Sequence, residues 1–96
     1  MIHILARITM KPESAALGRD ILTALQATTR KGEPGCLDYQ LLQQADAPHV
    51  FQTFELWADQ ASVDAHMASA HVGAAIAAAG PHFAAPPEIL GFNKLG

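Results

Sequence analysis

The sequence contains few of the residues that mark specialised classes of protein. Its single cysteine, Cys36, has no partner for an internal disulfide, which fits a reducing compartment. The six lysines and arginines form no basic cluster and the net charge is -3, so we expect no nucleic-acid groove. The apolar run Ile2–Ala6 ends at Arg7 and is too short to span a membrane or to form a signal-peptide core. These absences favour a cytoplasmic protein without nucleic-acid or membrane partners.

Motifs for several kinds of chemistry are also missing. The chain has no glycine-rich phosphate loop and no Gly-x-Ser-x-Gly nucleophile motif. No Cys/His spacing indicates zinc, and His66 and His71 are five positions apart, unlike the four-residue spacing of a helical metal pair. We therefore expect no metal site and no bound cofactor.

The composition indicates one small domain that needs an additional buried surface. The 96 residues form a single expected domain, residues 1–96, and half of them are apolar. A chain of this size buries a smaller share of its surface than a larger one does. A homodimer is the simplest way to cover the remaining apolar groups.

The apolar pattern predicts a mixture of strands and helices. Lys11-Pro12-Glu13 opens the first predicted helix, and Gly32 is its predicted left-handed cap. Asp59 and Ser69 are predicted N-caps of two later helices. In chain order we predict a strand over Ile2–Met10, a helix ending at Lys31, a hairpin of Cys36–Gln44 and Val50–Trp57 with a four- or five-residue loop, a short helix through Met67, a helix ending at Ala79, and a strand over Glu88–Leu95.

This order predicts an α+β, ferredoxin-like fold. Strand, helix, strand, strand, helix pair and strand form the split βαβ arrangement, in which helices cover one face of an antiparallel four-stranded sheet. The other face is left bare and apolar, so two copies packed through it would form a dimeric α+β barrel.

The second hairpin strand contains the first candidate site. Side chains alternate along a strand, so Phe51, Thr53, Glu55 and Trp57 share one face. A carboxylate beside an indole on a largely apolar face is the feature most suggestive of a site. Tyr39, on the preceding strand, is interpreted as packing.

Several segments together resemble the antibiotic biosynthesis monooxygenase family. The similar residues extend over nearly the whole chain, and among the members of the family this sequence looks most like the small quinol monooxygenases. They are Ile8–Lys11, Pro34-Gly35-Cys36-Leu37-Asp38-Tyr39, Phe51, Glu55-Leu56-Trp57-Ala58-Asp59 and Ala65-His66-Met67-Ala68-Ser69.

The resemblance implies a homodimer that oxygenates a quinol, a phenol or an aromatic polyketide without metal or flavin. Such a substrate must itself supply the electrons, and the protein contributes a dry pocket and a base for the phenolic proton. The resemblance makes His66 or His71 the base and gives Glu55 the role of orienting a histidine or binding a substrate hydroxyl. Trp57, with Phe51 and Thr53, is expected to line the pocket for the aromatic substrate, and molecular oxygen is the second reactant.

Two other functions are compatible with the same fold. The first is a non-catalytic dimer that binds a hydrophobic ligand, and the second is an isomerase of a small carbonyl compound, which needs a more polar pocket. A haem-degrading branch of the fold uses an asparagine on the first strand. Ala6 or Arg7 stands nearest that position here, which argues against haem degradation.

Overall fold

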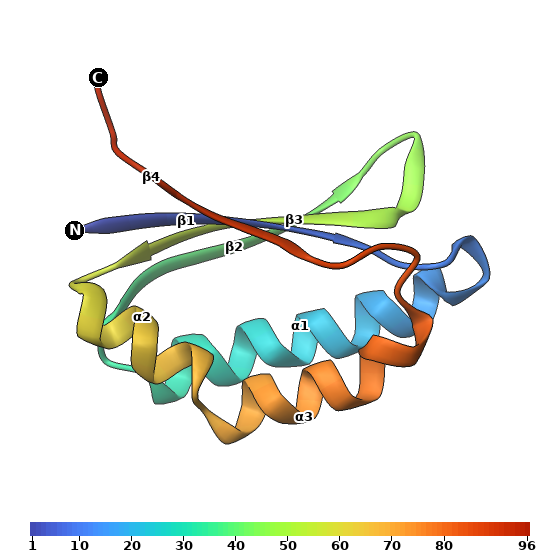
Figure 1. Ribbon diagram of the computed structural model, residues 1–96, viewed down its shortest axis with the longest axis horizontal. Coiled ribbons are helices and arrows are strands. Elements are labelled where there is room, and N and C mark those ends of the chain that lie inside the picture. Colours follow the sequence, from blue (N-terminus) through green and yellow to red (C-terminus); the bar gives the residue numbers. More distant parts are fainter.

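The computed structural model describes all 96 residues as one α+β unit (Figure 1). Its helices and strands follow the predicted order. They are β1 (Ile2–Thr9), the 3-10 helix η1 (Pro12–Ser14), α1 (Ala15–Gly32), β2 (Cys36–Gln44), β3 (Ala47–Trp57), α2 (Gln60–Met67), α3 (Ala70–Ala79), the 3-10 helix η2 (Gly80–His82) and β4 (Glu88–Phe92).

Two short polar side chains start the later helices as predicted. The Asp59 carboxylate accepts a hydrogen bond from the Ser62 backbone N–H at 2.8 Å, and the Ser69 hydroxyl accepts one from Val72 N–H at 3.3 Å. Each cap satisfies a backbone donor that has no partner within the helix. α2 and α3 are therefore two separate helices, and Ala68 and Ser69 form the corner between them.

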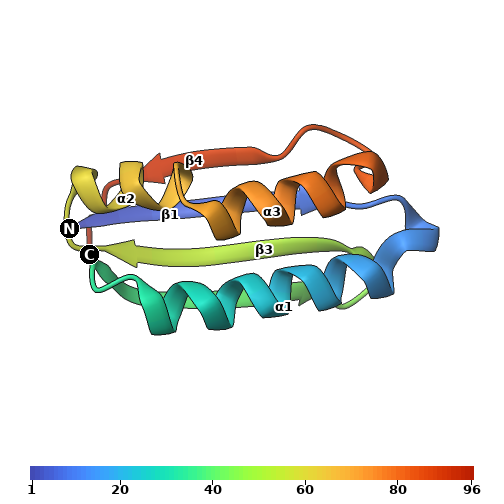
Figure 2. The same ribbon diagram turned by 90° about the horizontal axis from the view of Figure 1, so that it is seen from below.

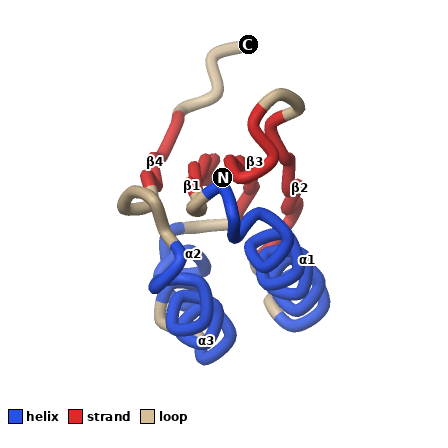
Figure 3. The backbone as a smooth tube through the Cα atoms, turned by 90° about the vertical axis from the view of Figure 1, so that its right-hand side faces the viewer, coloured by secondary structure: helices blue, strands red, loops and turns tan.

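The four strands form one antiparallel sheet in the order β2-β3-β1-β4. The helices cover one face and leave the other bare, as Figures 1 and 3 show. Seen from below, α1 and α3 run side by side beneath the strands (Figure 2). This arrangement confirms the predicted ferredoxin-like class.

Three local predictions were wrong. The hairpin turn consists only of Ala45 and Asp46, because β3 begins at Ala47 and accommodates Pro48 beside a shift in the pairing register with β2. Gly32 is not a left-handed cap, since no residue has a positive φ. β4 ends at Phe92, three residues before the predicted Leu95, where its pairing with β1 stops.

The bare face of the sheet has an apolar row across three strands. Leu5 on β1 pairs with Phe54 on β3 and with Leu90 on β4, so the three side chains lie next to one another. Phe54 is 43% exposed and Leu90 is 57% exposed. No helix in the structure is long and apolar enough to cross a bilayer.

Candidate active site

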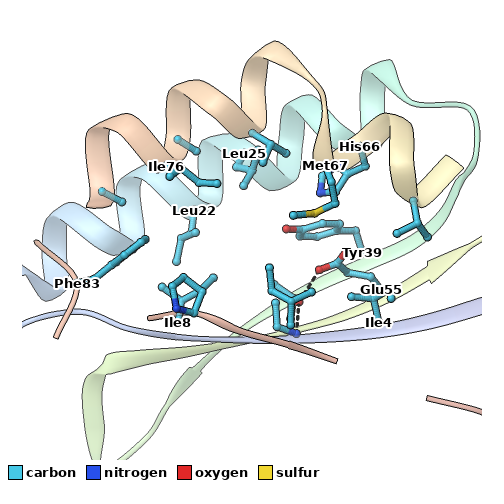
Figure 4. Close-up of a pocket in the computed structure, with 18 residues that line it drawn as sticks. Ile4, Ile8, Leu22, Leu25, Tyr39, Glu55, His66, Met67, Ile76 and Phe83 are labelled. Carbon is cyan, nitrogen blue, oxygen red and sulfur yellow. Dashed lines mark hydrogen bonds between the residues drawn. The ribbon is translucent and has the colours of Figure 1, made fainter. Parts of the chain in front are cut away.

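The space between the sheet and the helices contains an apolar cavity of about 110 Å³ (Figure 4). Fourteen of its 18 lining residues are hydrophobic. Ile8, Leu22, Ile76 and Phe83 lie toward one end in Figure 4. The polar groups gather at the other end, so one end of the cavity is apolar and the other is polar.

Glu55 is held by its neighbours on the same strand face. One carboxylate oxygen accepts a hydrogen bond from the Thr53 hydroxyl at 2.6 Å, and the other accepts one from the Trp57 indole N–H at 3.0 Å. Thr53 Oγ1 in turn accepts the backbone N–H of Ala6 at 3.0 Å. Glu55 is only 7% exposed and lines the cavity, so its carboxylate is a fixed hydrogen-bond acceptor in a mainly apolar space.

Tyr39 lies opposite Glu55 in the hairpin register and also lines the cavity. Figure 4 shows its hydroxyl directed into the cavity, on the same side as the Glu55 carboxylate. The residue is 3% exposed. Burial, followed by the negative charge of Glu55, raises the pKa of Tyr39 far above its ordinary value, so the hydroxyl stays protonated and can donate a hydrogen bond.

Tyr39→Phe is expected to reduce the loss of stability at alkaline pH. The unfolded chain ionises this tyrosine near pH 10 while the folded chain keeps it neutral, so the free energy of unfolding falls as pH rises above about 10. In that range the free energy of unfolding of the wild type should fall by about 1.4 kcal/mol more per pH unit than that of the variant. Urea unfolding at pH 9, 10 and 11 measures the difference. Parallel pH profiles for the two proteins would contradict the neutral Tyr39.

A second polar cluster joins the ends of all three α-helices. His66 Nδ1, on α2, lies 2.6 Å from Glu33 Oε2, and His71 Nε2, at the start of α3, lies 2.7 Å from the same oxygen. An ionised carboxylate only accepts hydrogen bonds, so we infer that both nitrogens carry hydrogen. The other ring nitrogen of His66, Nε2, has no hydrogen-bond partner within the chain.

His66 itself is packed tightly. It is 5% exposed, its ring centre lies 4.6 Å from that of Trp57, and it lines the cavity. His66 therefore lies between two environments: its Nδ1 contacts Glu33, which does not line the cavity, and the His66 residue itself is part of the cavity lining. This is the geometry in which a carboxylate orients an imidazole and leaves its other nitrogen available as a base.

The segment Glu33-Pro34-Gly35 explains why the cluster forms. A residue before proline favours extended backbone, and Glu33 adopts φ -114° and ψ 102°, which ends α1. Gly35 allows α2 to approach, because a Cβ there would overlap the side chain of Ser62. The end of α1 and the helix that contains His66 are thereby brought together.

Comparison with known proteins identifies the family. Residues 1–78 match the family model described as antibiotic biosynthesis monooxygenase, and these residues include every polar group described above. The chain belongs to the antibiotic biosynthesis monooxygenase family. No match was found among curated proteins.

Solved structures agree with this assignment. An antibiotic biosynthesis monooxygenase has 26% identity and a TM-score of 0.93, with 100% of both chains covered. A Caulobacter crescentus protein assigned to the same group has 30% identity and a TM-score of 0.90, covering 99% of this chain and 90% of its own. A Pseudomonas aeruginosa protein has 28% identity and a TM-score of 0.90, covering 99% and 94%.

The structure brings some of the expected site residues into the cavity of this family member and leaves others outside it. Glu55, Thr53 and His66 line the cavity. Trp57 and Phe51 do not line it. Trp57 donates a hydrogen bond to Glu55. Phe51 packs in the core with Met10 and Leu22. The structure thus places these two aromatic residues, which we expected in the substrate wall, outside the lining of the cavity.

The histidines also differ from the expectation. His71 is absent from the cavity and lies in a groove between α1 and α3. Glu55 hydrogen-bonds neither histidine, and its partners are Thr53 and Trp57. The carboxylate that orients the histidines is Glu33.

Sequence reasoning missed Glu33 and Tyr39 as site residues. Each had a local signal that could have indicated its position. Glu33 precedes a proline at the end of a helix and is therefore turned out of the helix. Tyr39 is the cross-strand partner of Glu55 once the short hairpin fixes the register, so it must lie on the same face.

Proposed function

We propose that this family member is a cofactor-independent monooxygenase of a quinol or another phenolic aromatic compound. The observation that carries the proposal is the gathering of Tyr39, Glu55 and His66 at one end of an apolar cavity. The cavity of about 110 Å³ is lined mainly by hydrophobic residues, which suits an aromatic substrate.

Each polar group has a role in this proposal. The apolar walls hold the ring and exclude water, and the Glu55 carboxylate accepts a hydrogen bond from one substrate hydroxyl. Tyr39 donates a hydrogen bond to a second oxygen of the substrate. His66 Nε2 removes the phenolic proton, because an imidazole that is oriented by a carboxylate is a suitable base near neutral pH.

The overall reaction is balanced without a further reductant. A ring C–H of the phenol becomes C=O, and one atom of molecular oxygen enters that carbonyl. The other oxygen atom leaves as water with the ring hydrogen and the hydroxyl hydrogen. The phenolate formed by His66 is the electron donor, so a substrate of this class needs no cofactor to supply electrons.

An oxygen electrode tests this proposal. In buffer containing EDTA and no flavin, the enzyme should consume one O2 for each quinone formed from a one-ring phenol or quinol. Binding of the quinol without oxygen uptake would contradict the reaction and favour a ligand-binding protein. Product formation without oxygen would favour the isomerase, although the apolar lining disfavours its polar substrates.

The homodimer is a further part of the proposal. Burial of the row Leu5, Phe54 and Leu90 against a second copy would remove three large apolar side chains from water. Light scattering at micromolar concentration should give twice the mass of one chain, and Leu5→Glu should give the single mass. Leu95→Glu is the matched control, because Leu95 is 98% exposed and lies beyond β4. A monomeric wild type would contradict the barrel.

A further inference from the structure

The cluster of Glu33, His66 and His71 has a property that the proposed reaction does not use. Its two imidazole nitrogens and one carboxylate oxygen all lie within 4.8 Å of one another. The geometry points to a binding site for Zn²⁺, or another divalent metal that prefers imidazole, at the junction of α1, α2 and α3.

The three donor atoms have the right chemistry for this class of metal. Two histidines and one glutamate form a ligand set used by zinc sites that keep an open fourth position. Imidazole nitrogen selects zinc, copper and nickel over calcium and magnesium, which prefer oxygen ligands. The two nitrogens also come from different helices, so the spacing of the histidines along the sequence does not limit the geometry.

The two contacts to Glu33 require a small adjustment, and the two imidazole nitrogens already lie within 4.8 Å of each other. Nitrogen and oxygen ligands lie about 2.0–2.2 Å from zinc, so ligands around a tetrahedral ion are roughly 3.3 Å apart. The present contacts of 2.6 Å and 2.7 Å to Glu33 Oε2 would have to lengthen by roughly 0.6–0.7 Å. The second Glu33 oxygen makes no hydrogen bond within the chain, and the carboxylate can therefore rotate.

The three side chains differ in exposure, so a bound ion would be buried on the His66 side and accessible to solvent on the His71 side. The His66 side chain is 6% exposed and that of Glu33 is 14% exposed, whereas the His71 side chain is 26% exposed. An ion can enter beside His71, in the groove between α1 and α3, and keep water as its fourth ligand. The site lies outside the cavity that holds the ring.

Metal binding would also change His66. A metal on Nδ1 takes the lone pair there and leaves hydrogen on Nε2, so Nε2 no longer accepts a proton. Zinc should therefore inhibit quinol oxidation. This consequence rests on the proposed function, while the metal site itself does not.

Calorimetric titration of the metal-stripped full chain with zinc chloride tests the site. We expect one ion per chain and no comparable binding of magnesium. Glu33→Gln and His71→Ala should each weaken zinc binding at least tenfold, and cobalt should give a tetrahedral visible spectrum that both variants lose. His49→Ala is the matched control, because it removes one imidazole outside the cluster and should leave binding unchanged.

The outcomes separate the site from the reaction. Absence of saturable binding at one ion per chain, or variants that bind as tightly as the wild type, would overturn the site. Equal weakening by His49→Ala or Cys36→Ser would also overturn the assigned ligands. If Glu33→Gln does not fold, as judged by circular dichroism, the more exposed His71→Ala provides the same test. Zinc binding without inhibition would support the site and contradict His66 as the base.

Discussion

Replacement of His66 by alanine is expected to lower the rate of quinol oxidation by about a hundredfold to ten-thousandfold. This is the usual effect of removing a positioned general base. The substrate would still bind, since the apolar walls, Tyr39 and Glu55 remain. The loss should therefore appear mainly in kcat, measured by oxygen uptake at saturating substrate.

The controls distinguish a chemical role of His66 from a packing role. His66 is buried against the Trp57 ring, so its removal also leaves a gap in the structure. Thermal unfolding must show that His66→Ala is folded at the assay temperature. His49→Ala removes a histidine that lies near the hairpin turn and does not line the cavity, and it should keep the wild-type rate. A folded His66→Ala with the wild-type rate would rule out His66 as the base.

Trp57→Ala is expected to lower the free energy of unfolding by about 3–5 kcal/mol, the usual cost of truncating a buried tryptophan. Trp57 is 0% exposed and packs with Tyr39 and Val63 in the cluster at the polar end of the cavity. The substitution also removes the hydrogen bond to one Glu55 oxygen. Urea denaturation at a fixed protein concentration measures the change, since any dimer makes stability depend on concentration.

Trp57→Phe separates the two contributions. It keeps an aromatic ring but cannot donate to Glu55, and an unsatisfied buried acceptor costs about 1–3 kcal/mol. We expect this variant to lie between the wild type and Trp57→Ala. If Trp57→Phe were as stable as the wild type, the hydrogen bond would not contribute to holding Glu55, and Trp57 would act through packing alone.

Much of the fold could be predicted because its signals are local. Asp59 and Ser69 are capping residues that need only the next three residues to act, and both helices begin where they indicate. The alternation in β3 likewise identified the buried face, which contains Thr53 and Glu55. These features depend on residues close together in the sequence.

The remaining parts of the site depend on contacts between distant segments. Glu33 lies 33 positions from His66 and 38 from His71, so no spacing rule relates the three residues. Trp57 and Glu55 share a strand face, but only the structure shows that the indole N–H turns toward the carboxylate and not toward the substrate space. Gly32 failed as a cap because Pro34 imposes extended backbone on Glu33, which ends the helix in another way.

The place of β1 in the sheet affects the order in which the chain can fold during synthesis. β1 is the first strand to be made, yet it lies between β3 and β4. Ile2 pairs with Trp57, and His3 pairs with Phe92. The α1 helix and the β2–β3 hairpin can form from neighbouring residues, whereas β1 must wait for its first partner until β3 has left the ribosome. Its second edge stays unpaired until β4 has also left the ribosome, so the part of the cavity wall that β1 and β4 provide forms after the hairpin.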